Sequence, residues 1–206
     1  MANDVDERPV LEAASRFFRG YNQYCQKANS DSLFALLNSM HSLGDRVEAV
    51  TGRDLLEFDE YRALKGLRNL SQHKEDVRSN FRNNPANTLS DLAFMCIVRR
   101  DQVENSIADV QEKWRSNAQN SCENCFHWYG PAVNIYPCIF NLGVRFYELL
   151  LELDLLPENE SIVAFKESYD YETAGEISHY VDGKFTAPIG KVEAILAELA
   201  SALPEA

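Results

Sequence analysis

The sequence lacks a hydrophobic run long enough to cross a membrane. Its longest apolar clusters, such as Phe94–Val98 and Leu149–Leu151, fall far short of the roughly 20 residues that a transmembrane helix needs. The first residues, Met1–Glu7, are acidic and polar, which is unlike a secretory leader. The five cysteines are an odd number, and without a leader they do not indicate a disulfide framework. We therefore expect a cytoplasmic protein without a membrane partner.

Positive charge is also scarce, because 20 basic residues face 32 acidic ones and the formal net charge is −12. Such a balance argues against broad, non-specific coating of nucleic acid. The average hides one basic stretch, in which only three acids accompany eight basic residues, so that its local charge is +5. The eight are Arg62, Lys65, Arg68, Lys74, Arg78, Arg82, Arg99 and Arg100. This stretch is compatible with a local phosphate site, although solvated helix faces produce such runs too.

Helical periodicity dominates what is present. The 206 residues, 45% of them hydrophobic, suit one compact domain or one domain with a sizeable insertion. Apolar residues recur at helical spacing over 9–29, with Pro9 in the first turn, and again from the break at Asn29–Asp31 up to Thr51–Gly52. These two segments predict an antiparallel helical pair, and residues 53–82 predict a third helical region.

The remaining chain predicts further helices and one irregular part. The run 92–98 fits a buried helix turn or a strand; we favour a helix, because helical spacing continues from Asp101 to Trp114. Residues 116–131 are typical of a connecting loop, and 132–156 and 191–203 of helices. Residues 169–172 and 179–185 suit a small hairpin around Asp182–Gly183. We expect an all-α bundle of about five to six main helices over 1–156, with 157–206 as a C-terminal extension packed on it.

The segment Arg68-Asn69-Leu70-Ser71-Gln72-His73 carries the strongest candidate chemistry. On a helix Asn69 and His73 are four residues apart and share a face, and the long Arg68 side chain can curl toward them. Histidine moves protons near neutral pH, arginine holds a phosphate by two parallel hydrogen bonds, and an amide orients either partner. Together they could cleave RNA without a metal, with the 2′-hydroxyl attacking its own phosphodiester. Lys65, Lys74, Ser71 and Gln72 are candidate binding residues beside them.

This segment resembles the ribonuclease motif of the HEPN superfamily, an Arg and a His separated by four to six residues with a polar residue, often Asn, after the Arg. The resemblance implies a helical bundle, a homodimer in which two motifs face one another, and metal-independent endoribonuclease activity without a cofactor. It also implies a toxin–antitoxin, phage-defence or stress system, with RNA as substrate and a protein antitoxin or regulator as partner. Glu75 stands where some HEPN toxins carry a regulatory Tyr. The resemblance covers the motif and its helical setting within 10–156.

Other candidates are weaker. Cys122, Cys125 and His127, with Cys138, have ligand-type spacing for zinc, but a single Cys-x2-Cys more often marks half-buried thiols. His41 lies in an apolar-periodic helix, which favours a packed core or boundary residue, and Trp114 could line a pocket or a dimer interface. The alternative function is a non-catalytic, acidic helical interaction or regulatory module whose motif is degenerate.

Overall fold

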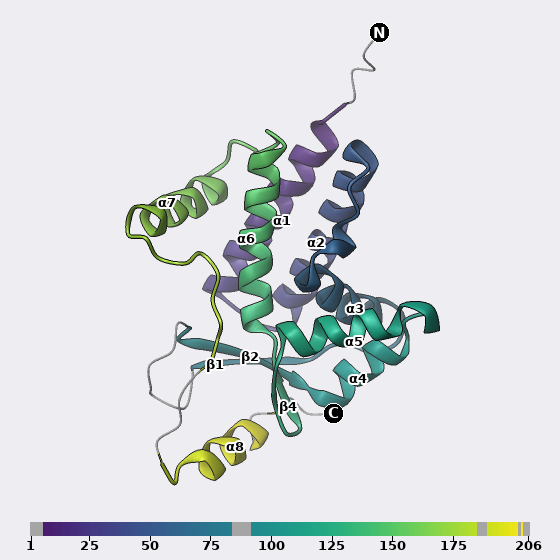
Figure 1. Cartoon of the computed structure of the whole chain (residues 1–206), viewed down its shortest axis with the longest axis vertical. Coiled ribbons are helices and arrows are strands. Elements are labelled where there is room, and N and C mark those ends of the chain that lie inside the picture. The colour runs from purple at the N-terminus through teal and green to yellow at the C-terminus, as the bar shows by residue number, and fades with distance from the viewer. Residues whose placement is uncertain (1–5, 84–91, 185–188, 202, 204–206) are drawn as a thin grey trace.

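The computed structural model describes residues 6–83, 92–184, 189–201 and 203 (Figure 1). In these ranges the chain is mainly helical, with eight α-helices, one short 3-10 turn and a four-stranded antiparallel sheet. The elements are α1 (Arg8–Gln26), α2 (Ser30–Thr51), the 3-10 turn (Leu55–Glu57), α3 (Asp59–His73), β1 (Ser79–Asn83), β2 (Phe94–Arg99), α4 (Arg100–Ala108), α5 (Glu112–Cys125), β3 (His127–Tyr129), β4 (Ala132–Asn134), α6 (Tyr136–Glu152), α7 (Glu160–Ala174) and α8 (Val192–Ser201). No helix in the described ranges is long and apolar enough to cross a membrane.

The predicted pair of N-terminal helices is confirmed as α1 and α2. Pro9 occupies the first turn of α1, where its missing N–H costs nothing. Asn29 caps α2: its side chain accepts a hydrogen bond from the Ser32 N–H at 2.8 Å, and the Ser32 hydroxyl accepts one from the Asn29 N–H at 2.9 Å. Gly52 ends α2 in the left-handed conformation that favours glycine. Local signals therefore set both helices.

The core of the bundle lies between α1, α2, α3 and α6, which stand together above the sheet (Figure 1). Aromatic rings fill it edge-on; the centroids of Phe17 and Phe146, for example, are 4.9 Å apart. The contact between α2 and α3 depends on Gly44, because a Cβ there would overlap the hydroxyl oxygen of Tyr61. Gly44 thus sets how closely α2 approaches the helix that carries the motif.

We expect Gly44→Ala to destabilise the protein. The added methyl must push Tyr61 and α3 away, and overpacking of this kind costs about 1–3 kcal/mol. Gly20→Ala is the matched control, because its Cβ would lie 3.5 Å from the Ser39 hydroxyl, an ordinary contact, and alanine favours a helix more than glycine does. Urea unfolding measures both; equal stabilities of the two variants would contradict this packing.

The sheet is the main departure from the all-α prediction. Its strand order is β1-β2-β4-β3, and every neighbouring pair is antiparallel. The run 92–98, predicted to be helical, forms β2 at the centre of this sheet. Cys96 and Val98 face the bundle core, whereas Met95 and Ile97 face a smaller cluster that includes Ile195 and Leu199 of α8. A strand buried on both faces is apolar throughout and loses the alternation that would identify it.

Other boundaries also differ from the prediction. The third helical region ends at His73 rather than at 82, and Ser79–Asn83 pairs with β2 as β1. The predicted loop 116–131 contains most of α5 and all of β3. The predicted C-terminal hairpin is wrong in the described residues, because 169–172 belong to α7; residue 185 lies outside them. The final helix is present as α8, and the eight described helices exceed the five to six expected.

Candidate functional site

The motif lies in the C-terminal half of α3, between α2 and α5 (Figure 1). Leu64, Leu67 and Leu70 bury one face of this helix in the core and so hold it in place. The opposite side carries Lys65, Arg68, Asn69 and His73, which we call the α3 cluster. Asn69 and His73 are exposed, and Lys65 and Arg68 are half-buried. The sequence prediction that these four residues share a helix is therefore confirmed.

Arg68 links α2 to the rest of the α3 cluster. Its Nε donates to Oδ1 of Asn38 on α2 at 3.3 Å, and its Nη1 donates to Oδ1 of Asn69 at 3.2 Å. Gln72, a predicted binding residue, donates to the same Asn38 oxygen at 2.9 Å. The Nη2 of Arg68 has no hydrogen-bond partner among the described residues. The guanidinium is thus held on two sides and keeps donors for an anion.

The other predicted residues divide into available and engaged groups. His73 is the last residue of α3, and its side chain forms no hydrogen bond or ion pair within the described ranges. Lys65 places its Nζ over the Tyr61 ring at 5.5 Å. Lys74 lies just beyond α3 and is engaged by Asp109 at 2.5 Å, and Ser71 is half-buried. Lys74 is therefore a weaker candidate for binding than the sequence indicates.

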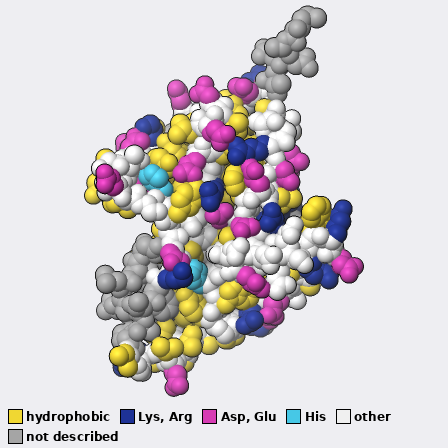
Figure 2. All heavy atoms as spheres, in the orientation of Figure 1, with side chains coloured by type: hydrophobic (Ala, Val, Ile, Leu, Met, Phe, Trp, Pro, Cys, Tyr) yellow, Lys and Arg dark blue, Asp and Glu magenta, His cyan; other side chains and the backbone are white. Residues whose placement is uncertain are grey.

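The basic stretch is largely neutralised in three dimensions. Five of its eight cations pair with carboxylates at Asp59, Asp109, Glu198, Asp101 and Glu104, all outside residues 62–100. The visible face accordingly mixes both signs of charge (Figure 2). Lys65 and Arg68 have no carboxylate partner among the described residues. Arg78, the remaining cation of the stretch, also has an interaction partner, so the cations left for a phosphate are those of the α3 cluster.

A pocket of about 470 Å³ borders the α3 cluster on the α5 side; we call it the Trp114 pocket. Lys65, Gly66 and Asn69 line its α3 wall, and Trp114 and Asn117 line its α5 wall. Trp114 is 54% exposed, and the Nζ of Lys113 lies over its ring, 5.2 Å from the centroid, so the opposite face of the indole is the one on which a base could stack. The sequence alone does not decide whether Trp114 lines a pocket or an interface. Asn69 and Trp114 are 45 residues apart in the sequence, so the sequence gives no sign that they line the same pocket.

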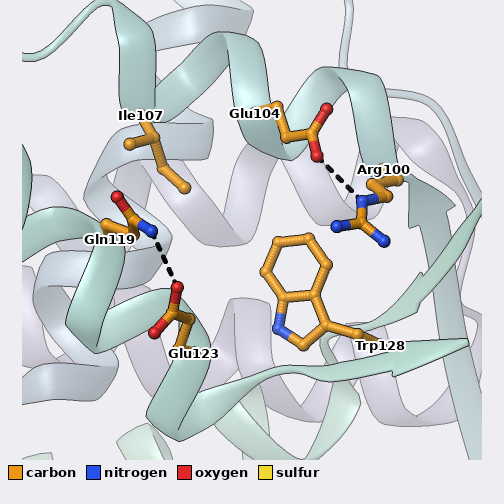
Figure 3. A pocket seen from close by; sticks show the side chains of 6 residues that line it. All are labelled: Arg100, Glu104, Ile107, Gln119, Glu123 and Trp128. Carbon is orange, nitrogen blue, oxygen red and sulfur yellow. Dashed lines mark hydrogen bonds and ion pairs between the residues drawn. The ribbon is translucent and has the colours of Figure 1, made fainter. Parts of the chain in front are cut away.

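A second pocket, of about 350 Å³, lies between α4, α5 and β3 (Figure 3). Arg100 bonds Glu104 at 2.8 Å, and Gln119 bonds Glu123 at 2.8 Å, whereas the buried Nε1 of Trp128 has no hydrogen-bond partner among the described residues. The Arg100 guanidinium also lies over the Trp128 ring at 5.3 Å. With its one cation paired in this way, this pocket offers less to a phosphate than the α3 cluster does.

The cysteines predicted as a weak zinc candidate lie near the contact of α5 with α6. Burial raises the pKa of the Cys122 thiol to about 12 and that of Cys138 well above its usual range, which opposes the thiolate that zinc requires. The Cys138 Sγ instead donates to the Glu60 carbonyl oxygen at 3.5 Å. In the described part of the chain no group of three or more His, Cys, Asp or Glu side chains is arranged to hold a metal ion. Cys125, His127 and Cys138 line a further pocket of about 590 Å³, whereas Cys122 is not among its lining residues.

Comparisons of the chain with protein-family models, with curated proteins and with solved structures find no match.

Proposed function

We propose that the protein is a HEPN-like, metal-independent endoribonuclease whose site is the α3 cluster. One observation carries this proposal: Lys65 and Arg68, two cations of the basic stretch that have no carboxylate partner in the described chain, lie on α3 with Asn69 and the exposed His73. Arg68 and Lys65 bind the phosphodiester, and His73 exchanges a proton with it. A tied arginine with unused donors suits stabilisation of charge on phosphate oxygens.

The Trp114 pocket supports single-stranded RNA as the substrate. An exposed indole with Lys113 over its ring and Lys65 in the same pocket, which Asp54 and Glu57 also line, suits the stacking of an unpaired base while cations hold its backbone. The amides of Asn69 and Asn117, on opposite walls, offer donors and acceptors to a base edge. Paired RNA would present its bases inside a duplex, where this ring does not reach them.

The experiment uses purified full-length protein, a labelled single-stranded RNA and the DNA of the same sequence, all in EDTA. We expect the RNA to be cut and the DNA to stay intact, because only RNA carries the attacking 2′-hydroxyl. Cleavage of both, or loss of cleavage in EDTA, would contradict the proposal. RNA that is bound but uncut would favour the alternative, a non-catalytic regulatory module. A homodimer, an antitoxin partner and a toxin–antitoxin or defence role are proposals from the resemblance alone.

We expect Trp114→Ala to weaken RNA binding more than it slows cleavage. Loss of one stacked base costs about 1–3 kcal/mol, or roughly 5- to 150-fold in affinity. Trp114→Phe keeps an aromatic face and should retain most of the affinity. Titration with a 2′-O-methyl oligonucleotide, which cannot be cut, measures this. Tyr171→Ala is the control, because that ring is 74% exposed on α7, away from the pocket; equal losses in both alanine variants would argue against stacking on Trp114.

A further inference from the structure

His41, on the α2 side of Arg68, has no role in the motif that the sequence indicates. It lies three residues after Asn38, so both occupy one face of α2. Asn38 contacts Arg68 and Gln72, whereas Gly44 contacts Tyr61, so His41 lies alongside the turn of α3 between these contacts. Lys65 and Arg68 belong to that turn. The packing of α2 on α3 therefore brings a second histidine to the cluster.

The His41 ring has the surroundings of a proton acceptor. Its Nδ1 is buried and lies 3.4 Å from Oδ1 of Asp45, one helical turn further along α2, without a hydrogen bond between them, and Nε2 likewise has no hydrogen-bond partner among the described residues. A proton on Nδ1, facing the carboxylate, leaves the Nε2 lone pair free. The side chain is 19% exposed, so it is partly shielded from water but still reachable.

The charges around His41 come from both helices. Burial lowers the pKa of His41; Asp45 on α2 raises it, and Arg68 and Lys65 on α3 lower it, with a net shift below the usual value of 6.5. The ring is therefore neutral at pH 7, as a general base must be. A phosphate bound by Arg68 would add negative charge beside the ring and favour its protonation.

We infer that His41 is a second catalytic residue of the proposed ribonuclease, acting as general base while His73 acts as general acid, and that Asp45 is its positioning residue. The inference rests on the proposed function. Cleavage of this kind needs both a base and an acid. His73 lies five residues beyond Arg68, about 7.5 Å along the axis of α3 and about 140° around it, and His41 lies across the α2–α3 contact. The long Arg68 side chain must therefore hold the phosphate toward the His73 face for it to lie between the two histidines of a single chain.

The reaction step balances without any co-reactant. His41 Nε2 takes the proton of the ribose 2′-hydroxyl, and the 2′-oxygen forms a bond to phosphorus. The bond from phosphorus to the 5′-oxygen breaks, and His73 donates a proton to that oxygen. The products are a 2′,3′-cyclic phosphate and a 5′-hydroxyl, and solvent exchange resets the two histidines.

The pH dependence of RNA cleavage by full-length His41→Gln and Asp45→Asn tests the inference. We expect His41→Gln to lower kcat by about 100-fold or more and to remove the rise in activity with pH that reports loss of the His41 proton. Asp45→Asn should lower kcat by a smaller factor and should move the rise in activity to lower pH, because Asp45 raises the pKa of His41. If Asp45 had a purely structural role, the pH at which activity rises would stay unchanged in Asp45→Asn. The control is His127→Gln, on β3.

The outcomes separate this inference from the proposed function. If the wild type cleaves RNA and His41→Gln has the same rate and pH profile, the role of His41 is overturned and the proposed function is retained. Intact RNA with wild type overturns the function itself. A third measurement needs no activity: NMR titration of the His41 ring with and without inorganic phosphate. Phosphate should raise the pKa of His41 in wild type and not in Arg68→Ala, and an identical titration of wild type in both buffers overturns the proposed site.

Discussion

Replacement of Arg68 by alanine is expected to lower kcat/KM for RNA cleavage by about 10²- to 10³-fold, the loss seen when one donor to a developing oxyanion is removed. The guanidinium is fixed by Asn38 and Asn69, so its free Nη2 needs little reorganisation to meet a phosphate oxygen. Arg68→Lys should restore only part of the rate, because an ammonium is a point charge and cannot make two parallel bonds.

Single-turnover cleavage of a labelled oligonucleotide measures this effect. Arg16→Ala is the matched control: Arg16 lies on α1, and among the described residues its only ion pair is a distant one with Glu12, at 4.0 Å. The melting temperatures of both variants show whether each protein is still folded. If Arg68 stabilises charge on the phosphate, its removal should lower the cleavage rate far more than threefold. A folded Arg68→Ala protein whose cleavage rate lies within about threefold of the wild-type rate would therefore contradict this role.

His73→Ala is expected to lower kcat by about 10²- to 10⁴-fold, the usual contribution of one general acid or base. Because His73 is exposed at the end of α3 and has no polar partner among the described residues, its removal should change the free energy of unfolding by only about 0.5 kcal/mol. The combination of lost rate and retained stability distinguishes a chemical role from a structural one.

The comparison is made with saturating RNA, so that kcat and KM separate. We expect KM to change little, since His73 acts on the proton rather than on the bound backbone. His127→Ala removes a different histidine, which is half-buried on β3, and should leave the rate unchanged. Equal rates for His73→Ala and wild type would leave the motif without its proton donor and would favour the regulatory module.

The helical part of the fold is predictable where the signals are local. Pro9, the Asn29–Ser32 cap and Gly52 bound α1 and α2 within a few residues of their ends, and each acts on neighbouring backbone. The sheet has no such local signal. Cys96 in β2 pairs with Phe81, and Ile97 pairs with Asn134, 37 residues away. An apolar run covered by the bundle on one face and α8 on the other reads equally well as a buried helix.

The candidate site is predictable in part for the same reason. Arg68, Asn69 and His73 are close in sequence, so a helix suffices to relate them. Asn38, His41 and Trp114 reach the cluster only through the packing of α2 and α5 on α3. His41 was interpreted as a packed boundary residue, and nothing along α2 alone distinguishes that role from one beside a cation.

The charge pattern misleads for a related reason. A sum over residues 62–100 counts eight cations and three acids, but ion pairs form between neighbours in space. Glu198 neutralises Arg82 from α8, and Asp109 neutralises Lys74 from the turn after α4. The sequence therefore overstates the size of the basic patch, while two of its members, Lys65 and Arg68, keep their place in the proposed site.

The chemical ends of the RNA products test the central claim most directly. Mass spectrometry of a single-stranded oligonucleotide incubated with the protein in EDTA identifies them. Attack by the 2′-hydroxyl with proton transfer by histidine predicts a 2′,3′-cyclic phosphate or its 2′- or 3′-monophosphate on one fragment and a 5′-hydroxyl on the other. A 5′-phosphate with a 3′-hydroxyl, or an oligonucleotide left whole, would contradict a ribonuclease built on Arg68 and His73.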